Sequence, residues 1–328
     1  MITVQPVSQT VLLLGIVTFS VTASSGTTMT YQWFKDGTAI PGATASSYTI
    51  LTVLGTSAGN YYVQVSNAGG SVVSNNATLN VVAPPGIITQ PQNQTTIKGQ
   101  NASFSVIASG TGPLSYQWFF KNKSIGATGT NATLTLLSVG PNQAGGYVVV
   151  LTNMLGSITS VVATLTVLVP PGISTQPQSQ SIVQGQSASF SVKASGTAPL
   201  GYQWNFNGTP MSGATTSALG LTNAQTAQAG GYTVLVTNSA GSVTSVVASL
   251  TVALPTISLS VAHGTGMSPT GFAFQASVPA GYTYVVLASS DFQSWIPIET
   301  NVATTGSVAF TDPAATNYSQ RYYRVTAQ

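Results

Sequence analysis

The stretch "AGGYTVLVTNSAGS" at residues 229–242 decides the fold, because two near-copies of it occur earlier in the chain. They read "AGNYYVQVSNAGGS" at 58–71 and "AGGYVVVLTNMLGS" at 144–157. After the tyrosine of the quoted stretch, apolar and polar side chains alternate, with Tyr232, Val234 and Val236 on one side of the chain. Alternation of this kind predicts a half-buried β-strand.

The stretch belongs to a longer repeat that occurs three times. The tripeptide "YQW" recurs so that Trp33, Trp118 and Trp204 stand 85 and 86 residues apart, and "FSV" precedes each of them. The joints read "APPG" (83–86) and "VPPG" (169–172), where paired prolines predict a short, stiff, extended linker. Since no stretch has a convincing helical period, we predict an all-β chain.

Each repeat resembles an immunoglobulin-like domain, with "FSV" as strand B, the tryptophan in strand C and "AGxY" leading into strand F. The resemblance implies a tyrosine corner, in which a tyrosine hydroxyl bonds back to the chain. The chain has no cysteine, and valines stand where the family has its inter-sheet disulfide. We expect these valines to fill the core, at the loss of a cross-link worth about 2–4 kcal/mol. The residues concerned are Tyr61, Tyr147 and Tyr232, and the pairs Val21 with Val63, Val106 with Val149, and Val192 with Val234.

From Pro255 onward the pattern changes. This part resembles the fibronectin type III-like sandwich that ends many secreted bacterial proteins of tandem immunoglobulin-like domains, and Trp295 and "RYYRV" (321–325) carry that likeness. We therefore predict four β-sandwiches forming an extended rod. The expected immunoglobulin-like domains are 1–83, 86–169 and 172–254, followed by the fibronectin III-like domain 256–328.

The composition excludes several functions. Only 3% of the residues are charged, where about 25% is usual, whereas 86 are Ser or Thr. A nucleic-acid partner is not expected, because the chain has no basic stripe to displace counterions. No apolar run reaches the roughly 18 residues of a membrane helix, so we expect no membrane span. The lack of cysteine excludes thiolate metal sites.

The few titratable side chains do not predict an enzyme, which needs several of them to converge. Asp36 has a turn role that Asn fills in the third repeat, and Asp291 and Asp312 have the sequence context of turn residues. His263 is interpreted as a loop histidine, and Glu299 has no catalytic partner in the pattern. We predict no catalytic, cofactor-binding or metal site and no cofactor.

The sequence favours a structural subunit of an extracellular bacterial filament, which assembles head-to-tail with itself. The alternatives are a carbohydrate- or cell-binding adhesin array and the non-catalytic tail of a secreted enzyme. Repeat one starts at its joint, so we expect that an upstream portion precedes Met1. A glycan coat would supply the solvation that charges normally give, and the Asn-x-Ser/Thr sites are Asn76, Asn93, Asn101, Asn122, Asn131, Asn207 and Asn317.

The predicted interface between subunits lies in the first repeat. There Leu13, Leu14 and Ile16 replace polar residues and glycine of the other repeats, and we expect them to be exposed beside a chain end. The segment "MITVQPVSQT" (1–10) could add a strand to a neighbour. A shifted register would instead bury Leu13 and Leu14 in their own domain. Phe119 should point outward, either toward a neighbouring domain or chain or toward a sugar.

Overall fold

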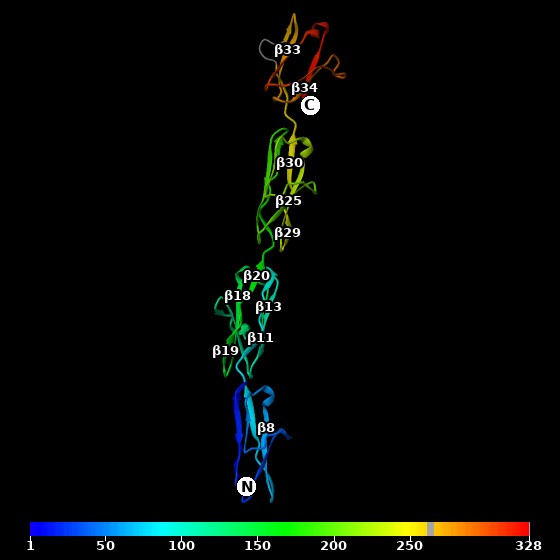
Figure 1. Cartoon of the computed structure of the whole chain (residues 1–328). Helices are drawn as coiled ribbons and strands as arrows, with labels where there is room; N and C mark the ends of the chain where they lie inside the picture. The colour runs from blue at the N-terminus through cyan, green and yellow to red at the C-terminus, as the bar shows by residue number, and fades with distance from the viewer. Residues whose placement is uncertain (261–265, 328) are drawn as a thin grey trace. The chain divides into compact units, whose positions relative to one another are not determined.

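A computed structural model of the chain describes residues 1–260 and 266–327. The chain divides into two compact units, Met1–Val169 and Pro170–Gln328, and strands dominate both units (Figure 1). The helices among the described residues are short 3-10 turns. The predicted all-β fold of tandem sandwiches is therefore confirmed.

Repeat one (residues 1–83) is a sandwich of two layers. Its main sheet has the strand order β2-β10-β8-β5-β6, and β9 pairs with β8. The opposite layer consists of β1 paired with β4 and β3 paired with β7. The elements are β1 (Ile2–Val4), β2 (Gln9–Leu12), β3 (Val17–Ser20), β4 (Thr22–Ala23), β5 (Thr30–Lys35), β6 (Thr38–Ala39), β7 (Ser47–Ile50), η1 (Gly55–Ser57), β8 (Gly59–Asn67), β9 (Gly70–Val73) and β10 (Ala77–Val82).

Repeat two (residues 86–169) has the same plan. Its main sheet has the order β12-β20-β18-β15-β16 with β19 beside β18, and β11–β14 and β13–β17 form the other layer. Figure 1 shows β18 and β19 on one side of this sandwich and β13 on the other. The elements are β11 (Gly86–Thr89), β12 (Gln94–Ile97), β13 (Ala102–Ser105), β14 (Ile107–Ser109), β15 (Ser115–Phe120), β16 (Lys123–Ser124), η2 (Gly126–Gly129), β17 (Thr133–Leu136), η3 (Pro141–Gln143), β18 (Gly145–Asn153), β19 (Gly156–Thr159) and β20 (Ala163–Leu168).

Repeat three (residues 172–254) repeats this arrangement, with the main sheet β22-β30-β28-β25-β26 and β29 beside β28. The strand pairs β21–β24 and β23–β27 form its second layer. The elements are β21 (Gly172–Thr175), β22 (Gln180–Val183), β23 (Ala188–Ser191), β24 (Lys193–Ser195), β25 (Gly201–Phe206), β26 (Thr209–Pro210), β27 (Ala218–Leu221), η4 (Thr226–Gln228), β28 (Gly230–Asn238), β29 (Gly241–Thr244) and β30 (Ala248–Ala253).

The C-terminal domain (residues 256–328) has a different strand order. One sheet runs β31-β33-β32 with β36 beside β33, and the other runs β35-β34-β37. Its likeness to fibronectin type III stays a prediction. The elements are β31 (Ser258–Ser260), β32 (Gly266–Ser268), β33 (Gly271–Ser277), β34 (Thr283–Ser289), β35 (Ile296–Val302), β36 (Val308–Asp312), η5 (Pro313–Asn317) and β37 (Tyr322–Ala327).

The predicted core of each repeat is confirmed. In repeat two, Val106 and Val149 are buried beside Trp118, and the indole Nε1 of Trp118 donates to the Asn131 carbonyl at 2.9 Å. Trp118 lies opposite Val149 in the register of β15 and β18. Apolar packing thus takes the place of a disulfide. The equivalent buried residues are Val21, Val63 and Trp33 in repeat one, and Val192, Val234 and Trp204 in repeat three.

The three tyrosine corners are also confirmed. Tyr61 Oη donates to the Ser57 carbonyl at 2.7 Å, and Tyr147 and Tyr232 make the same bond to Gln143 and Gln228 at 2.8 Å. Each ring stacks on the phenylalanine of "FSV", with centroids 4.7–4.8 Å apart. Burial raises the pKa of all three phenols, that of Tyr61 to about 12.

The N-terminal segment pairs within repeat one, and its addition to a neighbour's sheet edge stays a prediction. β1 pairs with β4, and β2 pairs in parallel with β10 through Leu12 and Val82. Ile2 packs against the core of repeat one, so the segment is already part of that repeat, although Val4 and Val7 are exposed.

Candidate functional site

The outward orientation predicted for three apolar residues of repeat one is observed. Leu13, Leu14 and Ile16 are 41%, 66% and 64% exposed, whereas the adjacent Val17 is buried. The shifted register that would bury the leucines is therefore not adopted. Their role as an interface stays a prediction.

Two further exposed leucines extend this surface. Val17 pairs with Ile50, which brings Ile16 beside Leu51, and the Leu14 amide donates to the Val53 carbonyl at 2.7 Å. Leu51 and Leu54 are both exposed. We call the set Leu13, Leu14, Ile16, Leu51 and Leu54 the leucine patch.

Leu14 has an unfavourable backbone conformation. Its φ is 66°, and the same turn is made in the other repeats by Gly99 and Gly185, both with a φ of 89°. A non-glycine residue in the left-handed region costs roughly 1–2 kcal/mol. Leu14 is thus an exposed leucine at a turn position whose backbone conformation favours glycine.

The leucine patch lies elsewhere in the repeat than the sequence suggested. The Leu13 amide donates to the Val82 carbonyl at 2.8 Å, and Val82 is the last residue of β10. Because β2 runs parallel to β10, the turn after β2 lies where the chain leaves repeat one. The prediction that the patch lies beside a chain end is therefore wrong.

A second surface lies on the main sheet of repeats one and two, on the face opposite the tryptophans. In repeat one Phe34 and Tyr62 are cross-strand partners, and their rings stack with centroids 4.9 Å apart and planes inclined by 4°. Both are half-buried, so the two rings form one flat apolar platform that still reaches solvent.

Phe119 lies at the corresponding position of repeat two. It is half-buried opposite Val148, and with Val162 these side chains line a groove of about 170 Å³. The corresponding pair in repeat three is Asn205 and Thr233. We call this face the outer face; at this cross-strand pair it is apolar in repeats one and two and polar in repeat three.

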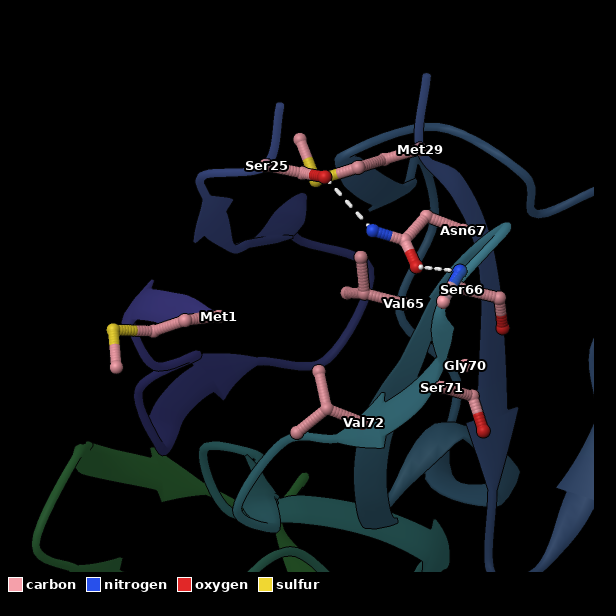
Figure 2. A pocket seen from close by; sticks show the side chains of 10 residues that line it. Met1, Ser25, Met29, Val65, Ser66, Asn67, Gly70, Ser71 and Val72 are labelled. Carbon is pink, nitrogen blue, oxygen red and sulfur yellow. Dashed lines mark hydrogen bonds between the residues drawn. The ribbon is translucent and has the colours of Figure 1, made fainter. Parts of the chain in front are cut away.

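A groove in repeat one lies at the end where the chain begins. It has a volume of about 360 Å³ and is lined by Met1, Met29, Val65 and Asn67 among others (Figure 2). Asn67 Nδ2 donates to Ser25 Oγ at 2.8 Å, and its Oδ1 accepts from the Gly69 amide at 2.8 Å. The side chain amide of Asn67 is thus bonded within the repeat itself.

The predicted turn roles of the acidic residues are confirmed. Asp36 Oδ1 accepts from the Asn60 amide, and Asn207 makes the equivalent bond to Gly231, both at 2.8 Å. Asp291 accepts from the amides of Ser294 and Gln293, and these bonds lower the pKa of its carboxyl. His263 lies outside the described residues.

Asp312 has a larger role than the sequence indicated. Its Oδ1 accepts from the Ala314 amide, as expected of a turn residue. Its Oδ2, however, lies 3.1 Å from Arg321 Nε in a buried ion pair, and accepts from Tyr323 Oη at 3.0 Å. Burial, followed by this bond to Asp312, raises the pKa of Tyr323 to about 12. The network joins two strands and η5 of the C-terminal domain.

All seven predicted glycosylation sites are exposed. Three of them use Oδ1 to accept a backbone amide, which leaves their role as glycan acceptors a prediction. The exposed residues are Asn76, Asn93, Asn101, Asn122, Asn131, Asn207 and Asn317, and those with a bonded Oδ1 are Asn93, Asn101 and Asn207.

Within residues 1–260 and 266–327, no group of three or more His, Asp or Glu side chains could hold a metal ion. In the same part of the chain, no helix has the length and apolar character needed to cross a membrane. The predictions that the protein has no catalytic, metal or cofactor site stay predictions.

The sandwiches, the tyrosine corners and the buried tryptophans give the three repeats an immunoglobulin-like fold. The family model described as "Immunoglobulin domain" matches residues 84–153 and 170–238. The I-band fragment I67–I69 from titin has a similar fold, with a TM-score of 0.55 at 22% identity, over 78% of this chain and 98% of the fragment.

Among curated relatives, the chain is similar to Protein sax-3 of Caenorhabditis elegans, with 29% identity over 155 residues, 46% of this chain and 12% of that protein. It is also similar to the human Cell adhesion molecule DSCAM, with 27% identity over 205 residues, 56% of this chain and 10% of that protein. The chain spans about a tenth of the length of these relatives. Both are animal proteins, so they do not support the predicted bacterial source.

Proposed function

We propose that the chain is part of an extracellular adhesion protein, whose immunoglobulin-like domains bind a protein on a cell surface. The similarity to a named cell adhesion molecule supports this function over the predicted filament subunit. The near absence of charge agrees with binding through shape and apolar contact, because few ion pairs can form across an interface of such a chain.

The observation that carries the proposal is the outer face of repeats one and two. The stacked Phe34–Tyr62 platform and the Phe119 groove occupy equivalent places on the main sheet. Aromatic side chains are enriched at the centres of protein interfaces, where they supply large apolar area. The polar pair Asn205–Thr233 at the same place in repeat three provides a natural control.

The test uses the full chain on beads, with binding to cells and bead aggregation as readouts. We expect Phe119→Lys and Tyr62→Lys to reduce binding at least about tenfold, as is usual for central interface residues. Thr233→Lys, which places the same charge on the same face of repeat three, should leave binding unchanged. Equal binding by all three variants would refute the proposal, whereas loss after glycosidase treatment of the cells would point to a carbohydrate partner.

A homopolymer joined through the exposed leucine patch is the second candidate. Burying such side chains is worth roughly 1.5–3 kcal/mol each, and a contact that does not close propagates as a fibre. Electron microscopy of the full chain should show fibres that Leu13→Lys combined with Ile16→Lys abolishes. Separate particles in both samples would exclude the homopolymer.

A further inference from the structure

The residue that ends repeat one is held by side chains of repeat two. The Ala83 amide donates to Thr111 Oγ1 at 2.8 Å, and the Ala83 carbonyl accepts from the Thr111 amide at 3.0 Å. Asn153 Nδ2 donates both to the Ala83 carbonyl at 2.8 Å and to the Thr111 carbonyl at 3.0 Å. Both polar groups of one peptide residue are thus bonded across the joint.

The absence of a side chain at Gly110 lets the backbone of Pro84 and Pro85 pack closely against it. A Cβ on Gly110 would lie 2.7 Å from the Pro84 carbonyl oxygen, and the φ of Gly110 is 124°. In the second unit, Gly196 has the same place: its φ is 146°, and a Cβ there would lie 3.0 Å from the Pro170 carbonyl oxygen. Asn238 Nδ2 donates to the Thr197 carbonyl at 2.9 Å, as Asn153 does to Thr111.

Repeat one keeps the asparagine but uses it differently. Ser25 stands in place of Gly110, and Gly26 in place of Thr111. Asn67 Nδ2 donates to Ser25 Oγ (Figure 2), so a hydroxyl of the same repeat takes the bond that the Ala83 carbonyl takes in repeat two. The threonine–asparagine pair is therefore not a general requirement of the turn.

We propose that Thr111 and Asn153 form a latch, which clamps Ala83 and makes the joint between repeats one and two stiff. Proline fixes only its own φ and restricts the residue before it, so the other torsions of the Ala83–Pro84–Pro85 segment need further restraint. The latch supplies this restraint through hydrogen bonds to the amide and to the carbonyl of Ala83. This inference does not depend on the adhesion proposal, since stiffness and binding are measured separately.

Asn153→Asp separates the latch from the turn in which it lies. The Leu155 amide donates to Asn153 Oδ1 at 2.9 Å, and an aspartate keeps that acceptor. The same change removes both donors and places a carboxylate against two carbonyl oxygens. Below the ordinary aspartate pKa of about 3.9, the protonated side chain can donate again and should restore part of the latch.

The experiment measures distances between spin labels in the full chain, which has no cysteine of its own. Cysteines at the exposed positions Ser20 and Ser105 report the first joint, and a pair at Ser105 and Ser191 reports the second. Since one hydrogen bond is worth about a factor of five, loss of the bond from Asn153 to Ala83 in Asn153→Asp should lower the ratio of latched to unlatched joints by roughly fivefold. The Ser20–Ser105 distribution should broaden at neutral pH, narrow again near pH 3, and leave the second pair unchanged.

Two further variants keep the test decisive. Asn67→Asp makes the same change in repeat one and should leave both distributions as they are. Thr111→Val removes the acceptor of the Ala83 amide and should broaden the first distribution even if Asn153→Asp fails to fold. Unchanged widths in Thr111→Val and in folded Asn153→Asp would overturn the proposal.

Discussion

Replacing Val149 with aspartate tests whether apolar packing stabilises the position at which immunoglobulin-like domains usually have a disulfide. Val149 is fully buried in β18, opposite Trp118. Its backbone amide donates to Ser160 Oγ at 3.0 Å. The neighbouring core is apolar. A carboxylate at this position would have no cation and no spare donor beside it.

The expected loss of about 4.5–8 kcal/mol is comparable with the whole free energy of unfolding of one repeat. Removing a buried valine forfeits about 1.5–3 kcal/mol, and an unpaired buried charge costs about 3–5 kcal/mol more. A domain of this size is stable by only about 4–12 kcal/mol in total. We therefore expect Val149→Asp to unfold repeat two or to leave it only marginally folded.

Hydrogen exchange followed by mass spectrometry on the full chain measures each repeat separately. Peptides from β15, β18 and β20 should lose protection in Val149→Asp, while those of repeat three keep theirs. Val161→Asp is the matched control, because Val161 is exposed in the same repeat and surface changes stay within about 0.5 kcal/mol. Unchanged protection of β18 in Val149→Asp would refute the account of the core.

The remaining predictions concern pH, a buried ion pair and a strained turn. The pKa of Tyr61 is about 12 in the folded state and 10 in the unfolded state. The free energy of unfolding of repeat one should therefore be constant up to pH 9 and fall from pH 10 to 12 by about 1.4 kcal/mol per pH unit. Urea midpoints measure this fall, and Tyr61→Phe should reduce it. Asp312→Asn leaves Arg321 buried without its counter-charge and should cost the C-terminal domain about 3–5 kcal/mol; equal melting of the variant and the parent chain would contradict this. Leu14→Gly removes about 1–2 kcal/mol of left-handed strain against about 0.5–1 kcal/mol of added chain entropy, so calorimetry should find repeat one no less stable, and a lower midpoint would count against the strain.

The sequence predicts the interior of the repeats well, because local signals and burial agree there. Alternation along the strands, "YQW" and "AGxY" each specify one side chain orientation, and burial of Trp118, Val149 and Tyr147 follows from it. The same signals do not reveal Ser160, which is buried beside Val149 and satisfies its amide. Ser160 is one of 86 Ser and Thr residues in the chain, and no sequence pattern distinguishes it from the others.

The candidate surfaces were predicted less well, since they depend on which ends of strands come together. The exposure of Ile16 followed from parity, and that of Leu13 from its place on a turn. The position of Leu13 beside Val82 instead follows from the parallel pairing of β2 with β10, which no local pattern specifies. The ion pair of Asp312 with Arg321 was missed for a related reason. The turn signal around Asp312 explained the residue locally, so nothing indicated a second partner.

The departures of one repeat from the others carry the functional information in this chain. Where all three repeats agree, as at Tyr61, Tyr147 and Tyr232, the side chain serves the sandwich. Where they differ at equal backbone geometry, the sandwich does not require the residue, as Gly99 and Gly185 demonstrate for Leu14. A leucine that is exposed and costs backbone strain is therefore best explained by a contact outside its own repeat. Substitution at such positions should change binding or joint motion before it changes folding.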